Sequence, residues 1–182
     1  RPLVAWVSPS GGWTDFAVGD VNHDGDAEII AIGGDANTGK LAVYDPVVTA
    51  GPIDPAQVIN GIPWATLYQV AIPGQPTLIG AGDLNPTVLG DEIVYAYRLN
   101  NVDKVHSDDQ TRLVLLQANH LPADGRSWRT PIAPYDFEEV WTHLTVRELD
   151  GHPGAHRTLI GDPAPTNLLS LYTNRQDMLR PS

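Results

Sequence analysis

The sequence contains no cysteine, and this absence excludes disulfide bridges, cysteine-ligated zinc, iron–sulfur clusters and thiol nucleophiles together. Basic residues are also scarce: 11 Lys and Arg stand against 22 Asp and Glu, which gives a formal net charge of −11. This charge does not suit nucleic acid, whose phosphates are neutralised by Lys and Arg. No apolar run approaches the ~18 residues that a membrane-spanning helix needs. We therefore expect that the protein does not bind nucleic acid and has no membrane-spanning helix.

The composition of the chain is that of a folded protein with many short strands. Its 182 residues correspond to about one domain, and 42% of them are hydrophobic, which is enough for a core. The 17 Gly and 16 Pro favour frequent turns. Helical periodicity is not convincing in any segment. These features predict an all-β fold.

Internal repetition is the most informative feature of the sequence. Phe-Ala-Val-Gly-Asp-Val-Asn at 16–22 returns as Leu-Ile-Gly-Ala-Gly-Asp-Leu-Asn at 78–85, and a degenerate copy occupies 144–151. Asp20 and Asp83 are 63 positions apart, and Asp83 and Glu148 are 65 apart. A near-constant period with the same local order indicates a repeat architecture.

Each period is predicted to hold up to four strands. They are expected at about 14–19, 28–33, 40–45 and 64–72, then at 77–82, 91–98, 111–117 and 137–143, and finally at 144–147, 157–161 and 167–173. Runs such as Ile-Ile-Ala-Ile at 29–32 are continuously apolar, which indicates that both faces of the strand are covered. Small four-stranded antiparallel sheets that repeat and cover one another are typical of a β-propeller.

We therefore expect a single partial β-propeller over residues 1–182, with three four-stranded antiparallel blades at approximately 13–72, 76–143 and 144–173. Residues 3–7 resemble the segment before the second repeat, so they are predicted to form an outer closing strand. Three blades are fewer than the ~4–8 that typically close a ring. Either the sequence is a fragment whose ring needs a missing segment, which we favour, or another copy of the chain completes the ring.

The sharpest chemical feature is the loop Asp-Val-Asn-His-Asp-Gly-Asp-Ala-Glu at 20–28. Oxygen-bearing side chains stand at loop positions 1, 3, 5 and 9, and a glycine at position 6 permits a sharp turn. Alternate oxygens around one centre suit a hard cation, and Ca²⁺ is the natural candidate. The alternative is an acidic hairpin loop that binds no metal. The predicted metal ligands are Asp20, Asn22, Asp24 and Glu28 through their side chains and Asp26 through its backbone carbonyl.

On these residues the sequence resembles the FG-GAP or VCBS repeat family, the calcium-binding blades of integrin-α-like propellers. The resemblance lies in residues 16–30 and in Gly-Lys-Leu-Ala-Val-Tyr at 39–44. The second repeat has Pro-Thr-Val-Leu-Gly at 86–90 where the central Asp-Gly would stand, and it is one residue longer. The third has Arg157 in place of the closing acid, and we expect no metal there. A weak second metal site is expected at most, formed by Asp83, Asn85 and Asp91.

The resemblance implies a calcium-stabilised recognition or assembly module, extracellular or at a cell surface, with a role such as cell adhesion. Its partner would be a protein or a glycan, bound at the end away from the calcium loops. The largest polar loop expected at that end supplies the candidate partner contacts Asn100, Asn101, Asp103, His106, Asp108 and Asp109.

Two alternatives remain open at this stage. Such propellers also occur as ancillary or catalytic domains of extracellular carbohydrate-active enzymes, and exposed members of the five Trp would suit a lectin. No nucleophile elbow or phosphate-binding loop is present, and no residue is predicted to be catalytic. A binding module is therefore expected before an enzyme.

Overall fold

The computed structural model describes residues 12–35, 38–46, 58–59, 62–84, 88–99, 110–119, 127–131, 133–137, 140–148, 157–164 and 170–173. This part of the chain consists of antiparallel strands and their connections, which confirms the all-β class. Within the described residues, no helix has the length and hydropathy needed to cross a membrane. The predictions for residues 3–7 and for the loop 100–109 lie outside the described residues.

The first sheet is an antiparallel meander that follows the predicted strands of the first repeat. In spatial order it contains β1 (Trp13–Gly19), β2 (Glu28–Gly33), β3 (Lys40–Pro46), β5 (Ile62–Ala71) and the two-residue β4 (Val58–Ile59). Ile30, Ala31 and Ile32 are fully buried, as the continuous apolar run predicted. Buried β-branched side chains on a pleated strand favour this conformation.

The second and third sheets continue in chain order. The second contains β6 (Gly74–Gly82), β7 (Glu92–Leu99), β8 (Thr111–Asn119) and β10 (Tyr135–Phe137), with β9 (Ser127–Arg129) paired farther along β8. The third contains β11 (Val140–Glu148), β12 (Arg157–Ala164) and β13 (Ser170–Thr173).

The structure differs from the sequence expectation where the second sheet passes to the third. Residues 137–143 were expected to close the second repeat, but residues 140–143 belong to β11 and pair with β12. The register of β11 shifts between Trp141 and His143. The segment before this irregularity stays close to the second sheet, because the Trp141 N–H donates to Thr111 Oγ1 at 3.1 Å. The strand β11 therefore pairs with β12 in the third sheet, while Trp141 near its start is hydrogen-bonded to the second sheet. In the second sheet, β10 takes the edge position beside β8.

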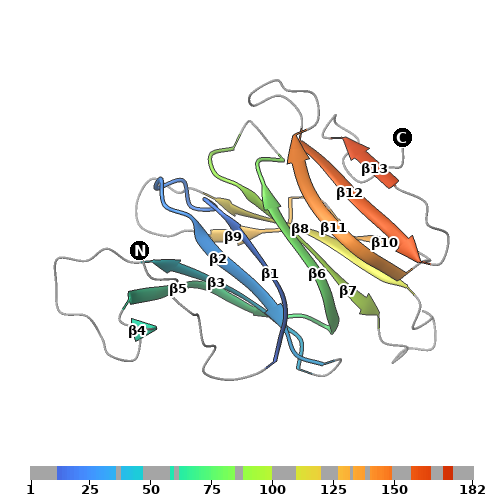
Figure 1. Cartoon of the computed structure of the whole chain (residues 1–182), viewed down its shortest axis with the longest axis horizontal. Helices are drawn as coiled ribbons and strands as arrows, with labels where there is room; N and C mark the ends of the chain where they lie inside the picture. The colour runs from blue at the N-terminus through green and yellow to red at the C-terminus, as the bar shows by residue number, and fades with distance from the viewer. Residues whose placement is uncertain are drawn as a thin grey trace.

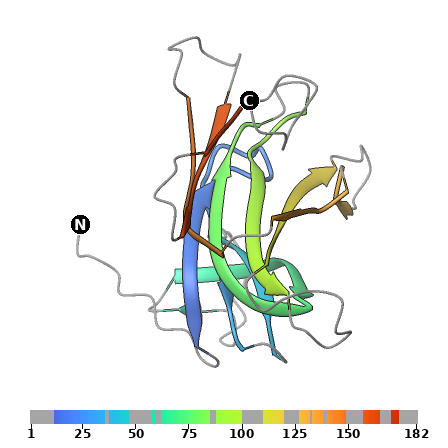
Figure 2. The same cartoon turned by 90° about the vertical axis from the view of Figure 1, so that its right-hand side faces the viewer.

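The three described sheets stack face to face, with β6 lying between β1 and β11 (Figure 1). One apolar cluster joins the first two sheets and includes Ile30, Ile32, Leu41, Ile79, Ile93 and Tyr95. A second cluster joins the second and third sheets and includes Val94, Ala96, Leu113, Leu115 and Trp141. In the side view of Figure 2 the strands within a sheet differ in direction, as expected from the twist between neighbouring strands.

We predict that Ile32→Ala lowers the free energy of unfolding by about 2–5 kcal/mol, because it leaves a cavity between the first two sheets. Ile32 is 0% exposed. Gln75→Ala, at an exposed position of β6, is the control and should change stability by less than about 0.5 kcal/mol. Urea denaturation measures both values, and equal losses would contradict the stacked arrangement.

Candidate metal centre

The loop that joins β1 to β2 is closed by its own acidic and amide side chains. Asp20 accepts hydrogen bonds from the N–H groups of Asp24 and Gly25, each at 3.1 Å. Asn22 Oδ1 accepts from the Asp24 N–H at 2.9 Å, and Asp24 Oδ1 accepts from the Asp26 N–H at 3.0 Å. Asp and Asn favour such turns, because their short side chains reach backbone N–H groups two residues on. The alternate oxygens therefore wrap the inside of the loop.

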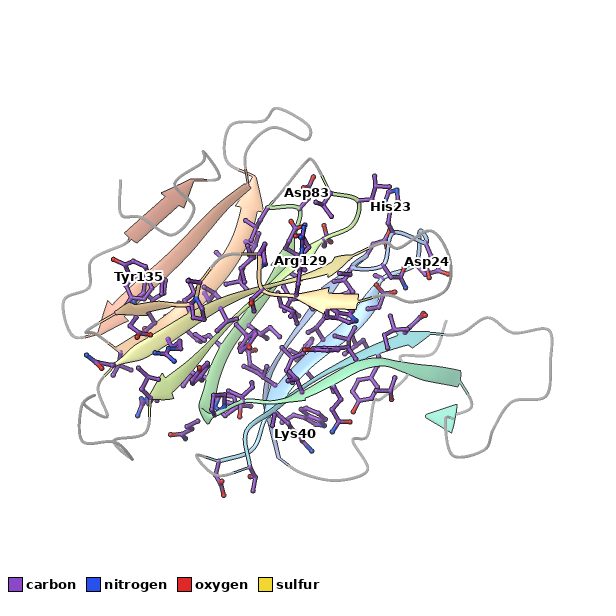
Figure 3. All side chains as sticks on the ribbon, turned by 180° about the vertical axis from the view of Figure 1, so that it is seen from behind. His23, Asp24, Lys40, Asp83, Arg129 and Tyr135 are labelled. Carbon is purple, nitrogen blue, oxygen red and sulfur yellow. The ribbon has the colours of Figure 1, made fainter. Side chains whose placement is uncertain are left out.

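Two residues with positive φ turn the chain within this loop. Gly25 has a φ of 94° and His23 a φ of 57°. A glycine adopts the first value without the steric cost that a side chain brings. His23 is exposed, and Figure 3 shows it at the same end of the molecule as Asp24 and Asp83, with Lys40 at the opposite end.

Glu28, the first residue of β2, closes the loop from inside the protein. Its side chain is fully buried, with Oε2 accepting from the Val21 N–H at 2.8 Å and Oε1 accepting from Asn22 Nδ2 at 3.1 Å. Burial raises the pKa of Glu28 from 4.5 to about 7, and the nearby carboxylates of Asp24 and Asp45 raise this pKa as well. The Val21 N–H lowers the pKa but does not offset these effects.

The third member of this group is Asp45, which the sequence analysis missed. Because Ile29 pairs with Tyr44 in the β2–β3 register, Asp45 stands opposite Glu28. One carboxylate oxygen from each of Asp24, Glu28 and Asp45 lies within 4.8 Å of the others, and this is the one such acidic group among the described residues. The sequence does show an acidic residue directly after the apolar residues 41–44. That this residue lies opposite Glu28 follows only from the pairing register of β2 and β3.

The predicted ligands thus take different places around the centre. Asp24 and Glu28 come together, whereas Asp20 and Asn22 line the loop and accept backbone N–H bonds. The Asp26 side chain is exposed. All available donors are carboxylate, amide or carbonyl oxygens, which is the ligand chemistry that a hard divalent cation prefers. The donor set therefore fits Ca²⁺ or a cation of similar character.

The second sheet repeats the buried glutamate but not the acidic neighbour. Glu92 begins β7, is 1% exposed, and accepts the Leu84 N–H at 2.7 Å, as Glu28 accepts that of Val21. Since Ile93 pairs with Leu116, residue 117 stands opposite Glu92, and here it is Gln117. The Gln117 amide donates to Glu92 Oε1 at 3.1 Å. An uncharged donor therefore occupies the place that Asp45 holds in the first sheet.

The residues expected to form the weak second site belong to the loop that joins β6 to β7. The Oδ1 atom of Asp83 is buried and has no hydrogen-bond partner. The Asp91 carboxylate instead accepts the Asp20 N–H at 3.2 Å, and the Asp91 N–H donates to the Asp20 carbonyl at 2.8 Å. Asn85 lies outside the described residues. The one-residue insertion in the second loop concealed that Glu92, one position after Asp91, is the counterpart of Glu28.

The second loop also braces the first one from outside. Gly90 has a φ of 94°, and a Cβ atom there would lie 2.9 Å from the Val21 carbonyl oxygen and 3.1 Å from that of Asp20. Only a residue without a side chain allows this approach. The geometry of the first loop therefore depends on how the second sheet stacks against the first.

The end of the strands opposite the acidic loop carries a second feature, a hollow of about 360 Å³. Gly12, Gly34, Asp35, Thr38 and Lys40 line it. The ammonium of Lys40, one of these lining residues, lies 4.6 Å from the centre of the Trp13 ring in a cation–π arrangement. All six loop residues predicted to contact a partner lie outside the described residues.

Comparison of the chain with protein-family models, with curated proteins and with solved structures finds no match.

We predict that, in the presence of a chelator, the raised pKa of Glu28 makes stability fall as the pH rises from about 4.5 to about 7. In this window the folded state retains a proton that the unfolded state has released, so raising the pH favours unfolding. Glu28→Gln should lack this component of the slope. Urea denaturation at a series of pH values checks it, and identical slopes for both proteins would contradict it.

We also predict that Gly90→Ala destabilises the protein more than Gly25→Ala. Both glycines have a φ of 94°, so both substitutions bring the backbone strain of a left-handed residue, about 1–2 kcal/mol. Only the new methyl group at Gly90 meets backbone atoms, since nothing lies within 4 Å at Gly25. Urea denaturation gives the difference, and equal losses would mean that the two loops do not brace each other.

Proposed function

We propose that this chain is part of a calcium-stabilised β-propeller that serves as an extracellular recognition or assembly module. The observation that carries the proposal is the fully buried Glu28 with an oxygen within 4.8 Å of oxygens from Asp24 and Asp45. A buried carboxylate beside two others is stable only if protons or a cation offset the negative charge. The oxygen donors and the turn at Gly25 favour a cation.

Three features of the fold support the propeller part of the proposal. The described strands form successive antiparallel sheets, the sheets stack through apolar faces, and the first strands of adjacent sheets contact each other. In the FG-GAP and VCBS families that the sequence resembles, the calcium loop joins the first two strands of a blade, and here the acidic loop joins β1 to β2. A buried glutamate recurs at the start of β2 and of β7, and this recurrence supports the interpretation of the sheets as repeated blades.

The residues of the loop have a structural role in this proposal. When bound, the cation supplies positive charge to the carboxylates of Asp24, Glu28 and Asp45. Asn22 orients Glu28 through its amide, and Asp20 holds the turn through two backbone N–H groups. Loops of this kind suit the millimolar Ca²⁺ outside cells, where affinities of about 10⁻⁴–10⁻³ M suffice. This expectation supports an extracellular or cell-surface location.

Recognition of a protein or glycan is proposed at the end of the strands away from the acidic loop. The resemblance implies ligand binding there, and the hollow lined in part by Lys40 gives that end a concave surface. The tryptophans of the second and third sheets are engaged in packing. Trp141 is 2% exposed, and the Trp128 ring stacks on Tyr68 with 4.9 Å between centroids. This packing favours a structural role for these rings over sugar stacking.

We predict that the chain binds one Ca²⁺, and that saturation at 100 times the dissociation constant stabilises it by about 2.7 kcal/mol. Calorimetric titration with Ca²⁺ gives stoichiometry and affinity, and thermal denaturation with Ca²⁺ or chelator gives the stabilisation. Glu28→Gln and Asp45→Asn should each weaken binding at least tenfold, because each removes one of the converging charges.

The matched control for this experiment is Glu92→Gln. Glu92 is equally buried and makes the same backbone hydrogen bond, but it faces Gln117 instead of a second acid. This variant should therefore bind Ca²⁺ as the unsubstituted chain does. Absence of binding heat together with superimposable melting curves in Ca²⁺ and chelator would refute the calcium centre.

A further inference from the structure

The strand pairings place one cross-strand row of residues at the same position in each of the first two sheets. Residues that stand opposite one another on neighbouring strands lie side by side across the sheet. We name these the first row, formed by Gly19, Glu28, Asp45 and Ala65, and the second row, formed by Gly82, Glu92, Gln117 and Arg129. The first row contains two acids and no base, whereas the second contains one acid and one base.

Each row buries a glutamate that needs compensation. Glu28 is 0% and Glu92 1% exposed. Each carboxylate accepts one backbone N–H from the loop before it, that of Val21 at 2.8 Å and that of Leu84 at 2.7 Å. A buried carboxylate is stable when hydrogen bonds or positive charge offset its loss of water. The two rows therefore differ in the residues that follow the glutamate, and not in the glutamate itself.

Gln117 is the neighbour of Glu92 in the second row. It is 1% exposed, and its amide Nε2 donates to Glu92 Oε1 at 3.1 Å. Asp45, at the corresponding place in the first row, instead brings a further carboxylate oxygen within 4.8 Å of one from Glu28. An amide has a donor end and an acceptor end, so Gln117 can donate to Glu92 in only one of its two orientations.

Arg129 of β9 occupies the last position of the second row and favours this orientation. Its Nη2 donates to Gln117 Oε1 at 3.5 Å. A guanidinium has donors only, so it contacts the acceptor end of the amide and leaves the donor end for Glu92. Arg129 is exposed, so its charge remains hydrated, and Figure 3 shows it toward the end of the molecule that carries Asp83. The first row has Ala65 at this position, a residue type without a side-chain donor or a charge.

The acids of the second loop do not converge as those of the first loop do. Among the described residues, the first loop and its neighbouring strand hold the one set of three acids whose oxygens approach within 4.8 Å. In the second loop the Asp91 carboxylate accepts the Asp20 N–H, and Asp83 Oδ1 is buried without a hydrogen-bond partner. The resemblance implies a calcium ion at such a loop, but the described donors of the second loop do not fit one.

We propose that the second sheet carries its own cation: Arg129, acting through Gln117, compensates the buried Glu92, and the second loop holds no divalent ion. The Gln117 amide supplies the hydrogen bond, while the guanidinium supplies positive charge and keeps the amide in place. The comparison with the first sheet rests on the proposed calcium centre, whereas the contacts of the second row do not depend on it. Removal of Ca²⁺ should therefore affect the first loop and leave the second row intact.

Thermal denaturation of single and double variants tests the role of Arg129. Arg129→Met should lower the melting temperature by about 2–4 °C, the shift expected for one net hydrogen bond in a chain of this size, and equally in Ca²⁺ and in chelator. Arg98→Met is the matched control, because Arg98 is an exposed arginine of β7 outside the row, and its shift should be about 1 °C or less. In a Glu92→Gln background the effect of Arg129→Met should fall to that of the control, since no charge remains to compensate. Equal shifts for the two arginine variants, or an undiminished shift in the Glu92→Gln background, would overturn the proposal.

Calorimetric titration with Ca²⁺ separates this proposal from the calcium centre of the first sheet. The unsubstituted chain, Arg129→Met and Glu92→Gln should all bind the same number of ions. Two ions bound by the unsubstituted chain and one by Glu92→Gln would place an ion in the second loop, where Asp83 Oδ1 is unpartnered, and would overturn the proposal. No binding by any of the three proteins would contradict the calcium centre alone, because the melting temperatures of the arginine variants would still decide the role of Arg129.

Discussion

Burial of one carboxylate at the start of the second strand of a sheet is the constraint on which the rest of the structure depends. Glu28 and Glu92 occupy this position in the first two sheets and close the preceding loop by accepting a backbone N–H. Burying a carboxylate costs several kcal/mol unless hydrogen bonds or opposite charge compensate it. The second sheet supplies the amide of Gln117. In the first sheet the Asn22 amide donates to Glu28, but Asp45 adds a further carboxylate beside it. The first loop therefore has negative charge that these hydrogen bonds do not compensate.

The second sheet also helps to hold the first loop in its conformation. Asp91 and Gly90 contact the backbone of Asp20 and Val21, so the loop is held from outside as well as by its own side chains. Near the other end of β1, Asp15 Oδ2 accepts the Ile79 N–H of β6 at 3.2 Å. Acidic side chains therefore connect the first two sheets at both ends of the apolar cluster. The conformation of the candidate cation centre therefore depends on how the second sheet packs against the first.

Most of the strands could be predicted from the sequence because their apolar runs are long and bounded by Gly, Pro, Asn and Asp. Residues 140–143 were an exception, because nothing in the residue types around Trp141 indicates the irregular register of β11. The short strands β4, β9 and β10 were not predicted either, since they lie in or beside segments that the sequence analysis left as connections. In the candidate centre, Asp24 and Glu28 were predictable from loop spacing alone. Asp45 was not, because it reaches Glu28 through strand pairing, which spacing along the chain does not reveal. Glu92 was concealed by a one-residue insertion.

The sizes of the contacting side chains explain why the stack turns rather than runs straight. Between the first strands the contacts are small: a Cβ on Gly19 would lie 3.0 Å from that of Ala81, and one on Gly82 would lie 2.7 Å from Val146. Between the last strands of the first two sheets, the rings of Tyr68 and Trp128 stack instead. The interface between the first two sheets is therefore thinner at the first strands than at the outer strands, as in a wedge. Sheets that stack as wedges rotate about the side of their first strands, so the direction of the turn follows from the sizes of the residues at the two sides of the interface.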